Sequence, residues 1–204
     1  MPARLRSTTL ATALLAGLLS ASGSVTGPAR ATDGSAAAVG TAAAATPSGC
    51  WMVASDGGVF SFGDAKFFGS TGNIKLNKPI VGMAATPTGR GYWLVASDGG
   101  IFSFGDARFY GSTGGSPPPR PVSGMAATPN GRGYWLTTSG GRVFAFGEAK
   151  FAGNVGPAFA APCIGIVSAP GGYRLVDSRG NVFHRDTTRA HTRITSAAPL
   201  IAAG

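Results

Sequence analysis

Short apolar runs alternate along the chain with turns rich in glycine, proline and aspartate. In the clearest run, Tyr92 to Ala96, side chains alternate between the two faces of an extended strand. Trp93 and Val95 lie on one face, and Tyr92 and Leu94 lie on the other. Because both faces are apolar, we expect a neighbouring sheet to cover each of them.

Turn residues on either side of this run predict further strands. Ser97-Asp98-Gly99-Gly100 favours a type I′ hairpin turn, because glycine and aspartate tolerate positive φ, and the next strand is then Ile101 to Phe104. A short strand over 81–87 precedes the run, ended by a Pro-Gly turn. We expect Arg108 to Ser112 to form a short fourth strand.

This unit recurs along the chain with a period of 42 residues, marked by Trp51, Trp93 and Trp135. A fourth, altered copy over 172–183 has Arg174 at the tryptophan position. Four short antiparallel strands in about 40–50 residues are typical of one β-propeller blade. A parallel β-helix is less favoured, because it needs shorter coils and fewer hairpin turns.

The expected fold class is therefore all-β and propeller-like, with about four blades of four short antiparallel strands. Terminal repeats are expected to be atypical, since one side lacks a neighbour. Two assemblies stay open: a ring or near-ring, and an open or incomplete arc that pairs with a second chain. The propeller-like domain spans 39–204, with repeats near 39–80, 81–122, 123–163 and 164–204.

The amino-terminal segment, 1–31, predicts a signal peptide. Arg4 and Arg6 precede an apolar run over 10–19, which is too short to span a bilayer comfortably. Ala29-Arg30-Ala31 offers a cleavage site, and a cut after Ala21, Gly23 or a nearby small residue is the alternative. An uncleaved anchor is the alternative. We expect residues 32–38 to form a flexible leader, and the mature chain to lack a membrane span and to be secreted or held at the cell surface or wall.

The chain has two cysteines, Cys50 and Cys163. In an exported protein an even pair favours one disulfide. A Cys50–Cys163 bond would join the first blade to the fourth and would stabilise closure of a ring. Two separate buried thiols are the alternative.

The run Gly91 to Ala107, together with 111–115 and 122–129, resembles a tandem repeat of exported actinobacterial proteins. In that group such repeats are thought to form WD40-like β-propellers, alone or beside cell-wall hydrolase or protease domains. The resemblance covers nearly all of 39–183. It implies the fold and secretion, and it supplies no catalytic residues.

Several recurring polar and aromatic residues have structural explanations. Asp56 and Asp98 fit turn positions, and the third repeat has Gly140 there, which argues against a Ca²⁺ ligand. The three tryptophans fit a core between blades better than a carbohydrate platform. His184 and His191 could belong to a hydrolase site, but the sequence has no G-x-S-x-G nucleophile elbow. They also lack a cysteine or a spaced third ligand for zinc. We therefore predict no catalytic, metal or cofactor site.

The formal charge is +9, and +6 remains without Arg4, Arg6 and Arg30. Arg90 and Arg132 occupy the same repeat position, so we expect them on one rim, as a candidate binding surface. Its partner would be a protein or an anionic cell-wall polymer, and we expect no nucleic acid. A solvated face is the alternative interpretation.

Together these features favour a secreted binding or scaffold module at the cell surface or in the cell wall. They do not fix its oligomeric state. One alternative is a cell-wall or ester hydrolase, and another is a non-functional remnant of a longer repeat array.

Overall fold

The computed structural model describes residues 38–43, 49–154, 161–184 and 192–193. All of them belong to one compact unit, Ala31–Gly204. The predicted signal peptide and nearly all of the predicted leader lie outside the described residues.

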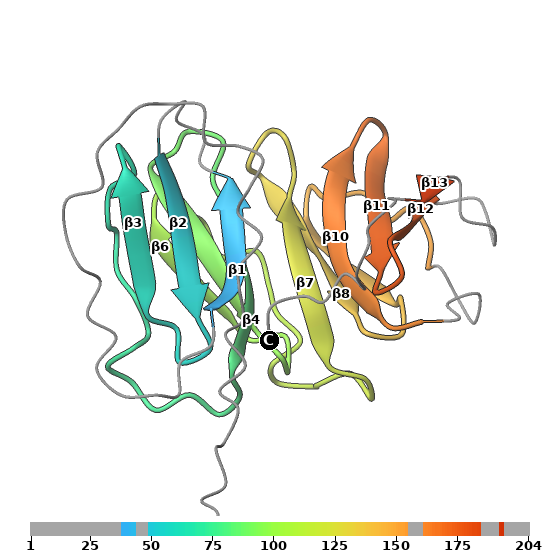
Figure 1. Ribbon diagram of the computed structural model, residues 1–204, viewed down its shortest axis with the longest axis horizontal. Helices are drawn as coiled ribbons and strands as arrows, with labels where there is room; N and C mark the ends of the chain where they lie inside the picture. Colours follow the sequence, from blue (N-terminus) through green and yellow to red (C-terminus); the bar gives the residue numbers. More distant parts are fainter. Residues whose placement is uncertain (1–37, 44–48, 155–160, 185–191, 194–204) are drawn as a thin grey trace, which may run out of the picture. The chain divides into compact units, whose positions relative to one another are not determined.

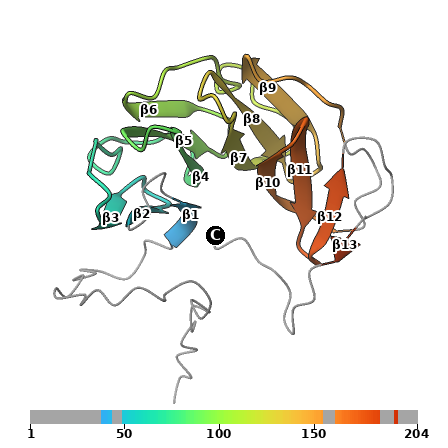
Figure 2. The ribbon, with the colours of Figure 1, turned by 90° about the horizontal axis from the view of Figure 1, so that it is seen from above.

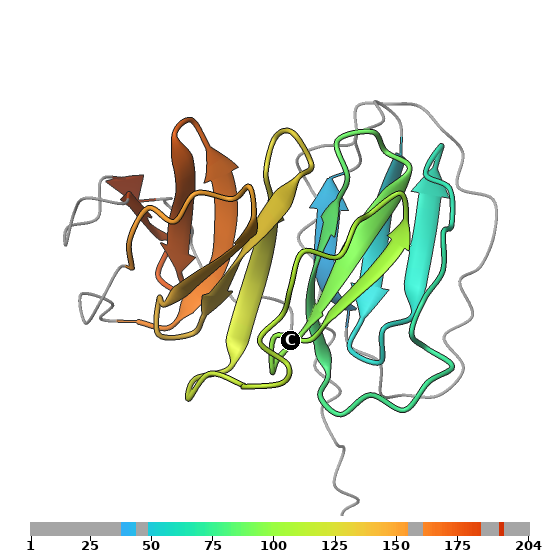
Figure 3. The same ribbon diagram turned by 180° about the vertical axis from the view of Figure 1, so that it is seen from behind.

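The described residues form strands and turns without helices, which confirms the all-β, propeller-like class. They make four small antiparallel sheets, with orders β1-β2-β3, β4-β5-β6, β7-β8-β9 and β10-β11-β12-β13. In each sheet the strands follow chain order from one edge to the other (Figures 1, 2 and 3). The strands are β1 Ala38–Ala43, β2 Gly49–Ala54, β3 Val59–Gly63, β4 Ile80–Ala85, β5 Gly91–Ala96, β6 Ile101–Gly105, β7 Val122–Ala127, β8 Gly133–Thr138, β9 Val143–Gly147, β10 Cys163–Ala169, β11 Gly172–Asp177, β12 Asn181–His184 and β13 Thr192–Arg193.

The predicted hairpin between β5 and β6 is present, but its turn is of another type. The Gly99 N–H donates to the Ala96 carbonyl at 2.8 Å, and the Ala96 N–H donates to the Gly100 carbonyl at 2.9 Å. This pattern is a three-residue loop closed by a glycine bulge, not a two-residue type I′ turn. Gly99 has φ +82°, so glycine is required at the third loop position.

The expected fourth strand is absent from the first three sheets, which have three strands each. The segment that was expected to form it, 108–112, is an irregular linker. Gly111 has φ +131°, which is incompatible with regular strand geometry. Among the described strands, the fourth sheet alone has a fourth one, β13, which pairs with β12.

Side chains from two different sheets hold each linker in place of a strand partner. The indole N–H of Trp93 donates to the Arg108 carbonyl at 2.7 Å. The hydroxyl of Tyr134, from the next sheet, donates to the Gly111 carbonyl at 2.6 Å and accepts the Tyr110 N–H at 3.1 Å. Backbone groups that would otherwise lack a strand partner are thereby hydrogen-bonded.

The same arrangement holds the linkers after β3 and β9. Trp51 donates to the Lys66 carbonyl, and Trp135 donates to the Lys150 carbonyl. Tyr92 and Tyr173 supply the hydroxyls from the following sheets. In each case the tryptophan and tyrosine rings also touch, with centroids 5.4, 5.7 and 5.5 Å apart along the chain.

Apolar side chains fill the space between successive sheets in three clusters. Every residue of β5 and of β8 is buried, which confirms that both faces of these strands are covered. The end sheets differ. In β2 the face with Trp51 is buried while Cys50 is only partly buried, and in β11 Arg174 is exposed. Each end sheet therefore has one covered face.

Glycines let the first strands of successive sheets approach closely. A Cβ added to Gly82 would lie 3.7 Å from the Gly124 Cα, and one added to Gly124 would lie 3.3 Å from the Gly165 Cα. β4 contacts β7, and β7 contacts β10, along this line. A larger residue at Gly124 would force two backbones apart, because the neighbouring atoms are backbone and cannot rotate away.

The expected Cys50–Cys163 disulfide is absent, and both cysteines are free thiols. The two residues belong to the first and fourth sheets, whereas the main contacts between described strands join sheets that follow one another in the chain. Cys163 is 1 % exposed and packs with Trp135 and Tyr173 in the core between the third and fourth sheets. The disulfide prediction was therefore wrong for this structure, and the alternative of separate thiols describes it better.

We predict that Gly124→Ala destabilises the protein while Gly165→Ala does not. The added methyl at 124 meets backbone, so the free energy of unfolding should fall by about 1–3 kcal/mol. At Gly165 a Cβ would meet nothing within 4 Å. Denaturant unfolding of both variants checks this, and equal costs would contradict the close approach of the two strands.

We predict that stability falls as the pH rises above 10. Burial raises the pKa values of Tyr92, Tyr134 and Tyr173 above the ordinary value of 10.0. The unfolded chain therefore loses these protons at a lower pH than the folded chain, so alkaline conditions favour unfolding. Below the ordinary pKa both states are protonated, and these groups add no pH dependence.

The Tyr134→Phe variant tests that assignment by denaturant unfolding at pH 8 and pH 10.5. At pH 8 it should lose about 1–3 kcal/mol, because the Tyr110 N–H and the Gly111 carbonyl lose their partner. Its further loss between the two pH values should be smaller than in the parent chain. A steeper alkaline loss would show that the tyrosines are not responsible.

We predict that a thiol reagent labels Cys50 and spares Cys163 in the folded protein at neutral pH. Burial raises the pKa of the Cys163 thiol, which disfavours the reactive thiolate, and it also blocks access. Mass spectrometry before and after denaturation should give one and then two labels. Two labels under native conditions would contradict the burial of Cys163.

Candidate binding surface

Arg90 and Arg132 both lie exposed, beside the turns that lead into β5 and β8. The Arg132 guanidinium pairs with Glu148 at 3.4 Å, with both side chains more than half exposed. Such an exposed pair is weak, but it partly neutralises the charge that the rim was expected to present. The sequence pattern did not reveal this pairing.

The carboxylates near this rim are occupied by the adjacent turns. Asp106 accepts the Thr86 hydroxyl at 2.8 Å and also the Thr88 hydroxyl. Glu148 accepts the Asn130 amide at 2.9 Å. These bonds tie the end of the third strand in a sheet to the turn after the first, which is a structural duty.

The recurring aspartates in the hairpin loops have the predicted turn roles. Asp56 and Asp98 accept the backbone N–H groups of Gly58 and Gly100 at 2.8 and 2.9 Å. Gly140 stands at this position in the third repeat, and the Arg120 side chain lies in the space that a Cβ would occupy there, 2.5 Å from it. Among the described residues, no group of three His, Cys, Asp or Glu could hold a metal ion.

Among the described residues, the tryptophans and the acid near β12 have structural roles. Trp51, Trp93 and Trp135 are at most 3 % exposed, which confirms their core role. Asp177 is buried and accepts the Arg179 and Asn181 N–H groups, so it closes a turn. His184 ends β12, and His191 and Asp186 lie outside the described residues.

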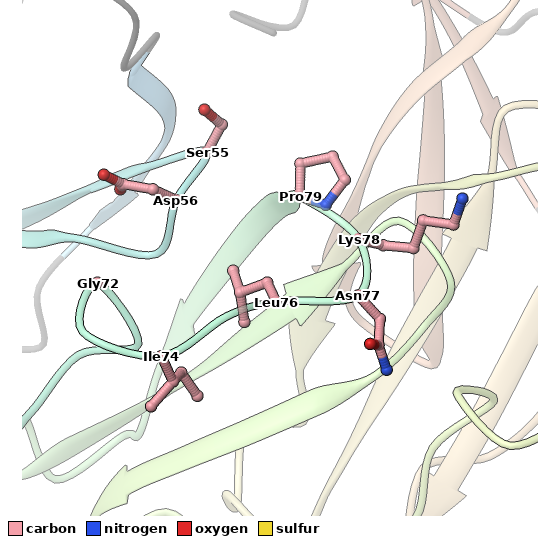
Figure 4. A pocket seen from close by; sticks show the side chains of 8 residues that line it. All are labelled: Ser55, Asp56, Gly72, Ile74, Leu76, Asn77, Lys78 and Pro79. Atoms are coloured by element: carbon pink, nitrogen blue, oxygen red, sulfur yellow. The ribbon is translucent and has the colours of Figure 1, made fainter.

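A depression of about 270 Å³ lies where the turn after β2 meets the linker that leads to β4. Its lining, shown in Figure 4, is Ser55, Asp56, Gly72, Ile74, Leu76, Asn77, Lys78 and Pro79. Asp56 has its turn role here, and no histidine or cysteine joins the serine. We see no basis for nucleophilic catalysis in this lining.

The structure reveals a repeated surface feature that the sequence pattern hid. Phe67, Phe109 and Phe151 are 59, 60 and 57 % exposed. Scattered exposed apolar residues are normal, but here one repeat position is exposed three times. From sequence these phenylalanines were assigned to the fourth strand, where half of the side chains would be buried. Their 42-residue period, two residues before a glycine in each repeat, was the available signal.

A cation precedes each phenylalanine: Lys66, Arg108 and Lys150, all exposed. None of the three forms an ion pair within the part of the chain that the structure describes. We call these six residues the Phe–cation row. They stand at equivalent positions after β3, β6 and β9, in sheets that contact one another in series.

The backbone of the row is fixed on both sides of each phenylalanine. At Phe109, the preceding carbonyl accepts the Trp93 indole and the following N–H donates to the Tyr134 hydroxyl. The same pair of bonds surrounds Phe67 and Phe151. The row therefore presents exposed aromatic rings on an ordered backbone, which lowers the entropy lost on binding.

Comparisons with known proteins give no information about the function of this surface. No family model matches the chain, and a search of the curated proteins finds no match. Across the described residues, no helix combines the length and apolar character needed to cross a membrane.

Proposed function

We propose that this chain is an exported binding or scaffold module that acts at the cell surface or in the cell wall. The observation that carries the proposal is the Phe–cation row. Its phenylalanines are not part of the cores between sheets, because each leaves more than half of its surface in water. A partner that covers them would remove the remaining exposed apolar surface of each ring from water, which favours binding.

The position of the row supports binding over catalysis. Catalysis needs a base, a nucleophile or a metal held in a concave site, whereas the row repeats one aromatic and one cationic side chain along irregular linkers. Such surface segments, positioned by a rigid scaffold, are where proteins commonly carry recognition residues. The linkers after β3, β6 and β9 would then serve binding as well as the connection of successive sheets.

Cosedimentation of the purified full-length chain with cell envelopes of its source organism tests the proposal. The triple variant Phe67→Ser, Phe109→Ser, Phe151→Ser should bind at least five times less than the parent chain. Its stability should change little, because the three rings are mostly solvated. A parent chain that stays in solution would refute the proposal.

Two control variants separate the row from other surfaces. Phe60→Ser with Ile74→Ser removes apolar residues that are 51 and 55 % exposed but lie outside the row, and it should bind normally. Arg90→Ala with Arg132→Ala tests the rim predicted from the sequence. Loss of binding in this last variant alone would assign the function to the rim and reject the row.

A further inference from the structure

We propose that the Phe–cation row binds a linear acidic polysaccharide, with a sugar ring on each phenylalanine and an anionic group at each cation. This inference rests on the proposed binding function and specifies its ligand. A ligand with a repeating structure is implied because the protein presents the same pair of side chains three times.

The chemistry of each pair fits an acidic sugar. The face of an aromatic ring is electronegative and attracts the polarised C–H groups of a pyranose face. The exposed cation next in sequence attracts a carboxylate. Neither nearby acid is paired with Arg108 or Lys150 in the described residues, since Asp106 accepts hydrogen bonds from two threonines and Glu148 is held by Asn130 and Arg132.

The spacing of the charges favours a polysaccharide over a nucleic acid. Each sheet supplies one pair, after its third strand, whereas neighbouring sheets contact one another mainly through their first strands. Successive pairs therefore lie at least as far apart as the roughly 10 Å between packed sheets. A nucleic acid strand carries a charge about every 3.4 Å, so most of its phosphates would lack a cation on this row. In an acidic polysaccharide the acid groups are separated by at least one whole sugar, so its charges are spaced more widely than phosphates and match one cation per sheet more closely.

Measuring the affinity of the full-length chain for polygalacturonate, neutral dextran and single-stranded oligo-dT tests the ligand class. We expect binding to polygalacturonate that weakens between 50 and 300 mM NaCl (concentrations chosen to span roughly the range in which surface charges become screened). We expect little binding to dextran. Equal or tighter binding to oligo-dT would overturn the inference in favour of general polyanion binding.

Charge variants test the row itself. Lys66→Gln, Arg108→Gln and Lys150→Gln together should weaken polygalacturonate binding about tenfold, because three exposed charge pairs with the ligand are lost and each is weak. Lys66→Arg, Arg108→Lys and Lys150→Arg together should preserve it. Lys75→Gln, Lys78→Gln and Arg179→Gln remove the same charge elsewhere and should have less than a threefold effect.

The outcomes distinguish the two proposals. Envelope binding that depends on the three phenylalanines, without affinity for polygalacturonate, would reject the acidic polysaccharide and retain the binding module. Equal losses in the two glutamine variants would show that net charge, and not the row, determines affinity, and would also reject the inference.

Discussion

Each linker in this protein is held by two aromatic side chains that belong to different sheets. Trp93 binds the linker that follows its own sheet, and Tyr134 binds the same linker from the next sheet. The two rings touch, so one contact joins a sheet, its linker and the following sheet. Within the segment 106–121, this contact supplies the hydrogen-bond partners of Arg108, Tyr110 and Gly111, while Asp106 and Thr113 bond to the backbone of β4–β6 and their turns. The cores between sheets, the glycine contacts and the ordered backbone of the Phe–cation row all depend on that coupling.

In each contact the tryptophan comes from one sheet and the tyrosine from the next sheet along the chain. The first and last repeats therefore differ from the middle ones. A tyrosine is needed only where a sheet precedes, and a tryptophan only where a linker and a sheet follow. The first repeat has Cys50 at the tyrosine position, and the last has Arg174 at the tryptophan position. The outer face of β2 and β3 accordingly leaves Phe60 and Phe62 exposed, whereas Phe104 packs against Gly69 of the preceding linker. To close a ring, the last sheet would have to contact the first sheet through the same tryptophan–tyrosine pair. Arg174 and Cys50 stand where that tryptophan and that tyrosine would be needed.

Periodicity was enough to predict the sheets and the burial of the tryptophans, because strand alternation and turn glycines are local signals. These local signals could not predict that the fourth strand is absent from the first three sheets. Arg108, Phe109 and Tyr110 have strand-forming composition, yet their backbone partners are side chains about 15 and 24 residues away. The candidate site was missed for the same reason, since exposure of Phe109 follows from the loss of that strand. Arg132 was identified as a rim residue, but its partner Glu148 becomes its neighbour only through the packing of β8 against β9.

The three separate clusters between sheets have a consequence for how this protein gains and loses structure. Each cluster joins only successive sheets, so stability is close to a sum over nearest neighbours, as in a one-dimensional array. The terminal sheets have one such coupling and the middle sheets have two. Amide hydrogens in β5 and β8 should therefore be the most slowly exchanging, and opening should proceed inward from both ends. An added or deleted 42-residue unit would change the length of the cooperative array while leaving the chemistry of every remaining interface intact.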